Sequence, residues 1–232
     1  MGKTRALLVV VGAIALCSCA GGEDSAAKGA LVIAQAKAAT GGEAWDRIRF
    51  WYERGRASPS SGESVEYEHW GDLHTLSVRN SNSRSGYMVF DGTMGYVCAD
   101  ADCTSRTPLD GRGMRTGAYL ASFGFFFPDR FPASFEYRGT QTDSGTEYEV
   151  VRVAPTGMDV VEIWVDSGTQ RVARLVQQPA AERTDLSDYR RVGDVLVPFG
   201  SRVADLTVQV STVRFDPPDA AAVVFTPPSQ PR

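Results

Sequence analysis

The sequence predicts a mainly β protein with helices (α+β), built on one antiparallel, strongly curved sheet. Apolar and polar residues alternate with a period of two along most of the chain, which is typical of strands with one buried face. Short turns containing Gly and Asp separate these runs, so neighbouring strands should pair as hairpins. A sheet of about ten to twelve strands normally curls or closes. One aromatic stretch, residues 113–131, has no Val or Ile and indicates an apolar plug or lid.

Length and composition limit the class of protein. The 232 residues are 43% hydrophobic, which is enough for one sizeable core. There is no internal repeat and no convincing boundary, so we expect a single domain over residues 26–228. The net charge is −4, whereas a nucleic-acid-binding surface needs a basic patch or stripe. We therefore expect no nucleic acid partner.

The N-terminus carries the signals of an exported protein. Lys3 and Arg5 precede an apolar run of eleven residues, which is too short to span a membrane but typical of a secretory signal. The following LCSCAG resembles the bacterial lipobox, with an aliphatic and a small residue placed before Cys19. We expect a lipoprotein signal peptide at 1–18, lipidation of Cys19 and a tether at 19–25. An ordinary signal peptide cut nearby would leave Cys19 a plain residue.

The first structured element is expected to be a helix over residues 26–40. Ser25 can cap its N-terminus, and Gly41-Gly42 ends it. The residues expected on its apolar stripe are Ala27, Leu31, Ala34 and Ala38. A short turn then places Trp45 and Ile48 on one side, ahead of the first strand.

Turn residues and alternation divide the remaining chain into strands. The expected turns are Gly71-Asp72, Asp91-Gly92, Asp143-Ser144-Gly145, Asp166-Ser167-Gly168 and Gly193-Asp194. Before the first of them, Val65, Tyr67 and His69 should face inward. Glu66 and Glu68 alternate with them and should face solvent.

The alternation slips by one residue near the C-terminus. Every second residue from Leu206 to Val210 shares one face, whereas Val213 and Phe215 are out of phase with them. An extra residue in one strand of an antiparallel pair produces such a slip. We therefore expect a β-bulge near Ser211-Thr212.

The aromatic insertion is expected to contain a helix over residues 112–123 that ends near Gly124. Its apolar stripe holds Tyr119, Leu120 and Phe123. Three consecutive rings, 125–127, follow directly, and consecutive side chains cannot all face one way. Some of these rings must be exposed unless the sheet or a ligand covers them. The insertion is thus either a functional lid or ordinary core.

Two cysteines lie close together after a predicted strand. Cys98 and Cys103 should form a disulfide, because such a pair usually does so outside the cytoplasm. A metal site in their place lacks partner ligands, since His69 and His74 are the only histidines and lie far off in the sequence. We expect neither a metal nor another cofactor.

Catalytic residues are not expected, and the protein should not be an enzyme. His69 and His74 could face each other across a hairpin, but no nucleophile is placed near them and no GxSxG elbow occurs. Asp100 and Asp102 resemble the start of a Ca²⁺ loop without the rest of its pattern. These carboxylates are expected to be solvated loop charges.

Several short motifs occur in a recognisable order over the predicted domain. They are Gly41-Gly42 with Trp45-x-x-Ile48, Phe90-Asp91-Gly92, Asp188-Tyr189 ahead of Gly193-Asp194-Val195-Leu196-Val197-Pro198, and Phe225-Thr226-Pro227-Pro228. Their order resembles the LolA/LolB-like superfamily of outer-membrane lipoprotein-sorting domains. The resemblance implies an unclosed β-barrel whose concave face is covered by helical lids, which forms an apolar cavity for acyl chains. The family's soluble carrier is not lipidated, so an anchored chain is closer to its receptor.

The resemblance leads to an expected ligand and location. We expect a lipid-anchored periplasmic protein that binds an acyl chain or the lipid moiety of a lipoprotein, in lipoprotein or lipid trafficking to the outer membrane. Ala20 follows Cys19 in place of the Asp that retains enteric lipoproteins at the inner membrane. The residues expected to close the cavity are Tyr119, Leu120, Phe123 and Phe126. The alternatives are an anchored protein-interaction or sensor domain with a packed core and no ligand, and a hydrolase, which would need a convergent polar triad.

Overall fold

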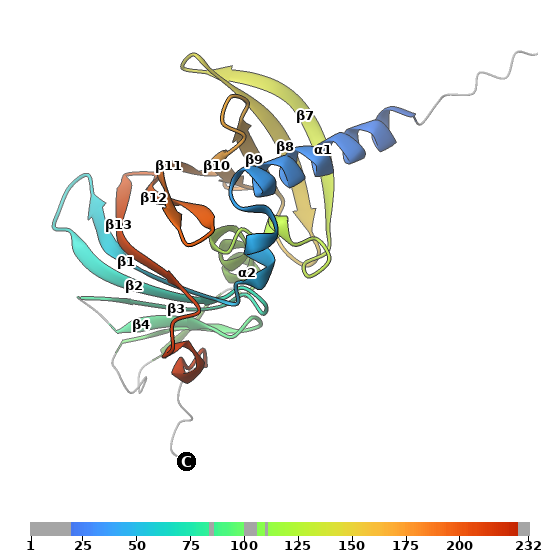
Figure 1. Ribbon diagram of the computed structural model, residues 1–232. Helices are drawn as coiled ribbons and strands as arrows, with labels where there is room; N and C mark the ends of the chain where they lie inside the picture. Colours follow the sequence, from blue (N-terminus) through green and yellow to red (C-terminus); the bar gives the residue numbers. More distant parts are fainter. Residues whose placement is uncertain (1–19, 84–85, 100–105, 110, 227–232) are drawn as a thin grey trace, which may run out of the picture.

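The part of the chain that the structure describes forms one 13-stranded antiparallel sheet with a few helices (Figure 1). The computed structural model describes residues 20–83, 86–99, 106–109 and 111–226. The strands are β1 (Phe50–Pro59), β2 (Val65–Asp72), β3 (Ser77–Asn82), β4 (Tyr87–Phe90), β5 (Gly95–Cys98), β6 (Arg106–Leu109), β7 (Ala133–Asp143), β8 (Thr146–Pro155), β9 (Val161–Asp166), β10 (Val172–Gln177), β11 (Glu182–Val192), β12 (Val195–Val203) and β13 (Leu206–Phe215). The helical elements are α1 (Ala20–Ala39), η1 (Gly42–Arg47), α2 (Gly111–Ala121), η2 (Gly124–Phe126) and η3 (Ala220–Ala222). The predicted fold class is confirmed, and β6 is a strand that the alternation did not indicate.

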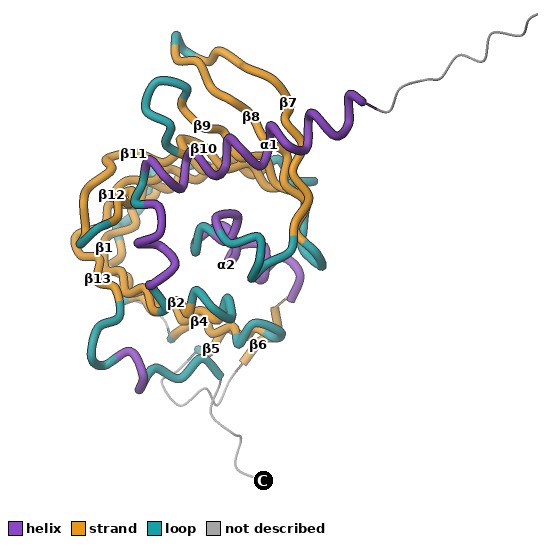
Figure 2. The backbone as a smooth tube through the Cα atoms, turned by 45° about the vertical axis from the view of Figure 1, so that its right-hand side comes forward, coloured by secondary structure: helices purple, strands orange, loops and turns teal. Residues whose placement is uncertain are grey.

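The strand order explains why the sheet stays open. It runs β6-β5-β4-β3-β2-β1-β13-β12-β11-β10-β9-β8-β7, so every paired strand lies beside a chain neighbour, and β1 with β13 is the one pair in this order that is not consecutive in the chain. The strands β6 and β7 therefore lie at opposite edges, and the aromatic insertion connects them. Figure 2 shows the sheet curling around α2, which lies inside the curve. A connection that crosses the concave side also covers it, as a helical lid does.

The first helix differs from the prediction in its start and in its buried face. It begins at Ala20, so Ser25 lies inside it and does not cap it. Leu31, expected to face inward, is 57% exposed. The buried residues of α1 are Gly29, Val32, Ile33 and Ala36. Burying the branched side chains of Val32 and Ile33 removes more apolar surface from water than burying a stripe rich in alanine.

The helix α1 connects two distant parts of the sheet. Near its start, the Ser25 hydroxyl donates a hydrogen bond of 3.0 Å to the Tyr137 carbonyl of β7. A Cβ on Gly29 would lie 3.1 Å from the Tyr137 backbone nitrogen, so the helix and the edge strand are in close contact. At the other end, the Thr40 carbonyl accepts a 2.7 Å hydrogen bond from the Leu196 nitrogen of β12. The helix between these contacts is about 22 Å long, and it crosses one end of the curved sheet.

A cluster of aromatic rings fills the concave side next to η1. This aromatic plug consists of Trp45, Trp51, Tyr119, Phe123, Phe125, Phe126, Phe131 and Phe215. The Trp45 ring centroid lies 5.6 Å from that of Phe123 and 5.7 Å from that of Phe126. The three consecutive rings 125–127 are all buried, because Phe123 adopts a left-handed conformation (φ 51°) and η2 then turns the chain. The cover that these rings require is thus supplied by the protein itself.

Most predicted turns are confirmed, and one is wrong. Asp91-Gly92, Asp143-Ser144-Gly145 and Gly193-Asp194 lie between paired strands. The predicted bulge is also present, since Arg54 pairs with Thr212 while Gly55 pairs with Val210 and skips Ser211.

The turn predicted at Gly71-Asp72 lies further along the chain. Both residues extend β2, and residues 73–76 make the turn. Leu73 and Leu76 are buried in it, so burial of these two side chains moves the reversal past the local turn signal. His74 is exposed in this turn and does not face His69 across a hairpin.

Candidate functional site

The concave side of the sheet has a packed half and a hollow half. The aromatic plug fills the half next to η1. The other half holds a cavity of about 970 Å³. On β1, Trp51 belongs to the plug and also reaches the cavity wall, while Ala57 lines the cavity further along the strand. The apolar lining includes Val65, Leu175, Leu186, Val203 and Val208 from the strands.

The lid side of the cavity comes from the aromatic insertion. Gly117, Leu120 and Ala121 of α2, together with Phe123, face the cavity opposite the sheet. Gly117 and Ala121 are exposed, as is Glu182 on β11, so the cavity opens to solvent between α2 and these strand ends. The insertion therefore serves both as core and as one wall of a cavity.

The residues predicted to close the cavity fall into two groups. Leu120 and Phe123 line it. Tyr119 and Phe126 are buried in the aromatic plug instead, with exposed fractions of 0% and 3%. A Cβ on Gly124 would lie 2.3 Å from the Tyr119 ring, which shows how tightly that ring is enclosed. Burial raises the pKa of the Tyr119 hydroxyl, so this side chain stays neutral in the core.

Four polar side chains on β1, β2 and β3 form a group in the cavity wall that we call the polar quartet. They are Glu53, Tyr67, His69 and Asn80. Glu53 is directly opposite His69 on the neighbouring strand, and His69 is directly opposite Asn80. The Tyr67 hydroxyl donates to the Glu53 carboxylate, and His69 Nδ1 lies 2.5 Å from Asn80 Oδ1.

The sequence indicated only part of this quartet. The alternation along β2 correctly placed Tyr67 and His69 on the inner face and Glu66 and Glu68 on the other. Glu53 and Asn80 were missed, because their place beside His69 depends on the register of three strands. Burial, followed by the charge of Glu53, raises the pKa of Tyr67, so its hydroxyl remains a donor.

Several other predicted site residues cannot be placed together. Cys98 ends β5, where it is buried beside the cavity. Cys103 and Cys19 lie outside the described residues. The Cys98–Cys103 disulfide and the lipidation of Cys19 therefore stay predictions. Within the described ranges, no group of three or more His, Cys, Asp or Glu side chains could hold a metal ion. No helix there is long and apolar enough to cross a membrane.

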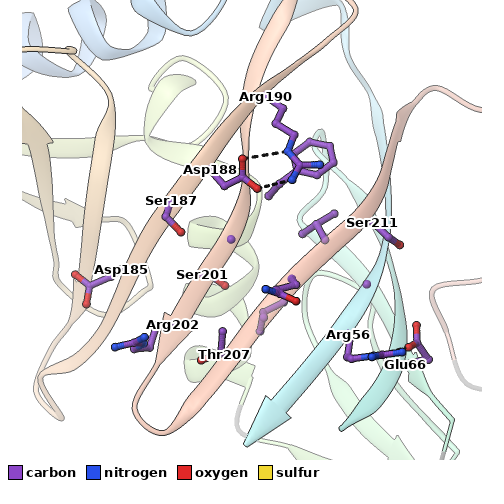
Figure 3. Close-up of a pocket in the computed structure, with 16 residues that line it drawn as sticks. Arg56, Glu66, Asp185, Ser187, Asp188, Arg190, Ser201, Arg202, Thr207 and Ser211 are labelled. Atoms are coloured by element: carbon purple, nitrogen blue, oxygen red, sulfur yellow. Dashed lines mark hydrogen bonds and ion pairs between the residues drawn. The ribbon is translucent and has the colours of Figure 1, made fainter.

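A second hollow, of about 720 Å³, lies on the opposite face of the sheet. Figure 3 shows its lining, which is dominated by charged and hydroxyl side chains. Arg190 donates to both carboxylate oxygens of Asp188, at 3.0 and 2.6 Å, and Arg56 donates to Glu66 at 2.8 Å. These charged groups are exposed and already form ion pairs with each other. Exposed ion pairs contribute little energy, so this second hollow would bind a ligand weakly. The concave cavity is the better candidate site.

The chain forms an open, curved antiparallel sheet with a cavity on its concave side, and solved structures with the same fold include the following three. An outer membrane lipoprotein-sorting protein domain from Vibrio parahaemolyticus has a TM-score of 0.57 and 11% identity, over 85% of this chain and 97% of its own. A LolA superfamily protein from Nitrosomonas europaea has a TM-score of 0.55 and 10% identity, over 85% and 97%. A DUF1329 family protein from Desulfovibrio piger has a TM-score of 0.51 and 10% identity, over 83% and 93%.

These comparisons establish the fold. No protein-family model and no curated protein matches the sequence. The chain has the LolA-like fold over most of its length, and the resemblance seen in the order of its motifs is confirmed at that level.

Proposed function

We propose that the protein binds an acyl chain, or a similar single apolar chain, in the concave cavity. The observation that carries this proposal is the hollow of about 970 Å³ beside the aromatic plug. Ligand sites are typically concave and mostly apolar, with a few placed polar groups and a volume of about 300–1,000 Å³. The fold shared with lipoprotein-sorting domains supports the same function, with a role in lipoprotein or lipid trafficking.

The energy available from such a cavity is sufficient for specific binding. Each buried methylene contributes about 0.8 kcal/mol, so ten contribute about 8 kcal/mol. A micromolar dissociation constant corresponds to about 8 kcal/mol. Loss of translational and side-chain freedom reduces the net value, and a longer chain offsets that loss.

The alternative of a packed sensor or interaction domain needs a filled interior. The aromatic plug fills only the half next to η1, and the hollow half favours a ligand. A hydrolase would need a hydroxyl or thiol nucleophile beside its histidine. Among the described residues, the hydrogen-bond partner of the His69 ring is the amide oxygen of Asn80, which disfavours a hydrolase. Binding without catalysis is therefore the function that we propose.

Filling the cavity tests the proposal. Ala57 faces the cavity from β1, so a Trp at this position stands upright from the sheet into the hollow. We expect Ala57→Trp to weaken binding of the uncharged probe N-phenyl-1-naphthylamine, measured by fluorescence, by about tenfold or more. Ser58→Trp is the matched control, because successive residues of a strand point to opposite faces.

Two results would contradict the proposal. Unchanged probe affinity in a folded Ala57→Trp variant would place binding elsewhere. Failure of the wild-type protein to bind the probe or any single-chain lipid would favour the packed sensor or interaction domain.

We further propose that a lipid on Cys19 anchors the protein to the outer membrane, facing the periplasm. Stable anchoring requires more than one acyl chain, and a lipobox Cys that carries a diacylglyceryl group and an N-acyl chain meets that need. Cys19→Ser should leave the protein in the soluble periplasmic fraction or block its processing. A processed variant that still partitions into detergent like the wild type would refute the anchor.

A further inference from the structure

The pairing of three strands holds the polar quartet together in the cavity wall. Its members come from three adjacent strands, and the register places Glu53, His69 and Asn80 side by side. The Tyr67 ring crosses over Gly55, where a Cβ would lie 3.0 Å from the ring and from its hydroxyl. The glycine thus leaves the room that lets the Tyr67 hydroxyl reach the Glu53 carboxylate.

The internal hydrogen bonds of the quartet determine what it offers to a ligand. A carboxylate only accepts, so Tyr67 donates and one Glu53 oxygen keeps free acceptor capacity. An amide oxygen also only accepts, so His69 donates through Nδ1 to Asn80. In the neutral ring, Nε2 is then an acceptor. The quartet therefore presents hydrogen-bond acceptors to a ligand.

The charge of the cavity also favours a ligand end that donates hydrogen bonds and is not anionic. Its described lining residues include two carboxylates, Glu53 on β1 and Glu182 on β11, and none of them is Lys or Arg. An anionic group placed beside Glu53 would meet a like charge in a partly buried site, where repulsion is stronger than in water. Elsewhere the cavity wall presents apolar side chains, such as Val65 on β2 and Leu175 on β10.

We propose that the polar quartet is a head-group site, which selects amphiphiles whose polar end is not anionic and carries hydroxyl or ammonium donors. This inference rests on the proposed function, since it requires the apolar chain to occupy the rest of the cavity. It narrows the ligand class from any acyl chain to one such as a glycerol ester, and it excludes a free fatty acid carboxylate or a phosphate end.

The test compares three ligands with the same twelve-carbon chain. Monododecanoylglycerol, dodecylamine and dodecanoate compete at pH 8 with bound N-phenyl-1-naphthylamine on the full chain carrying Cys19→Ser. We expect the first two to displace the probe at concentrations about tenfold or more below that needed for dodecanoate. This comparison on the unchanged cavity does not depend on any cavity variant folding.

A pair of variants assigns the discrimination to the quartet. Glu53→Gln should bring the affinity for dodecanoate to within about threefold of that for the glycerol ester, because the like charge is gone. Glu66→Gln removes the same charge from the opposite face of β2, where Glu66 pairs with Arg56, and should leave the ratio unchanged.

The possible results distinguish failure of the head-group site from failure of the proposed function. Probe binding with equal or tighter binding of dodecanoate overturns the head-group site and leaves the proposed function intact. A ratio that Glu53→Gln does not change also overturns it. Failure of the probe and all three ligands to bind overturns both proposals.

Discussion

Removing a ring from the aromatic plug should affect stability and ligand binding differently for a ring buried within the plug and for a ring at the cavity wall. Phe126 is 3% exposed, and its ring centroid lies 4.9 Å from that of Phe125 and 5.5 Å from that of Phe123. It does not line the cavity. Phe126→Ala should therefore lower the free energy of unfolding by about 3–5 kcal/mol, the usual loss for a fully buried Phe. Phe123→Ala should fall at the lower end of that range, because water or ligand can enter the space it leaves at the cavity wall.

Urea unfolding and probe binding together separate these two roles. The loss of about 3–5 kcal/mol in the free energy of unfolding expected for Phe126→Ala corresponds to a fall in melting temperature of roughly 6–20 °C for a domain of this size. Phe123→Ala should change the affinity for N-phenyl-1-naphthylamine, whereas Phe126→Ala should leave it unchanged while the protein is folded. The reasoning is refuted if Phe126→Ala loses less than about 1 kcal/mol. It is also refuted if the two variants change affinity equally.

Two further predictions concern glycines and pH. Gly124→Ala should destabilise by about 1–3 kcal/mol because its Cβ would meet the Tyr119 ring, whereas Gly117→Ala, with open space in α2, should stabilise by about 0.5–1 kcal/mol in the same urea assay. Hydrogen bonds from Arg174 hold the pKa of Asp143 low. Burial raises the pKa of Asp185, but hydrogen bonds from Arg183 and Arg174 outweigh it. These carboxylates stabilise the fold above the ordinary aspartate pKa of about 4, and that stability is lost as pH falls through their lowered values. Arg174→Gln should make the loss of stability below pH about 4 shallower, and an unchanged pH dependence would contradict this.

Features set by a few neighbouring residues could be predicted from the sequence. The hairpin at Asp91-Gly92 depends on local turn chemistry, and the Asp91 carboxylate accepts from the nitrogens of Thr93 and Met94. The bulge at Ser211 appears as a change of phase within one strand. The helix in the aromatic insertion follows from spacing, and it spans Gly111–Ala121 against the predicted 112–123.

Features that depend on distant partners could not be predicted in this way. The buried face of α1 is decided by its contact with β7, and the turn after β2 by burial of Leu73 and Leu76. The division of the concave side into plug and cavity depends on where η1 and α2 meet the strands. Glu53 and Asn80 join His69 only through the register of three strands, so one strand's alternation could not reveal the quartet.

Photo-crosslinking tests the central claim of a chain-binding cavity most directly. A monoacylglycerol with a diazirine near the end of its acyl chain inserts into whatever side chain lies beside that end. We predict crosslinks at cavity residues such as Val65, Leu175 and Val208, located by peptide mass spectrometry and abolished by Ala57→Trp. Crosslinks confined to exposed apolar residues outside the cavity, such as Leu31 and Val224, would contradict the account.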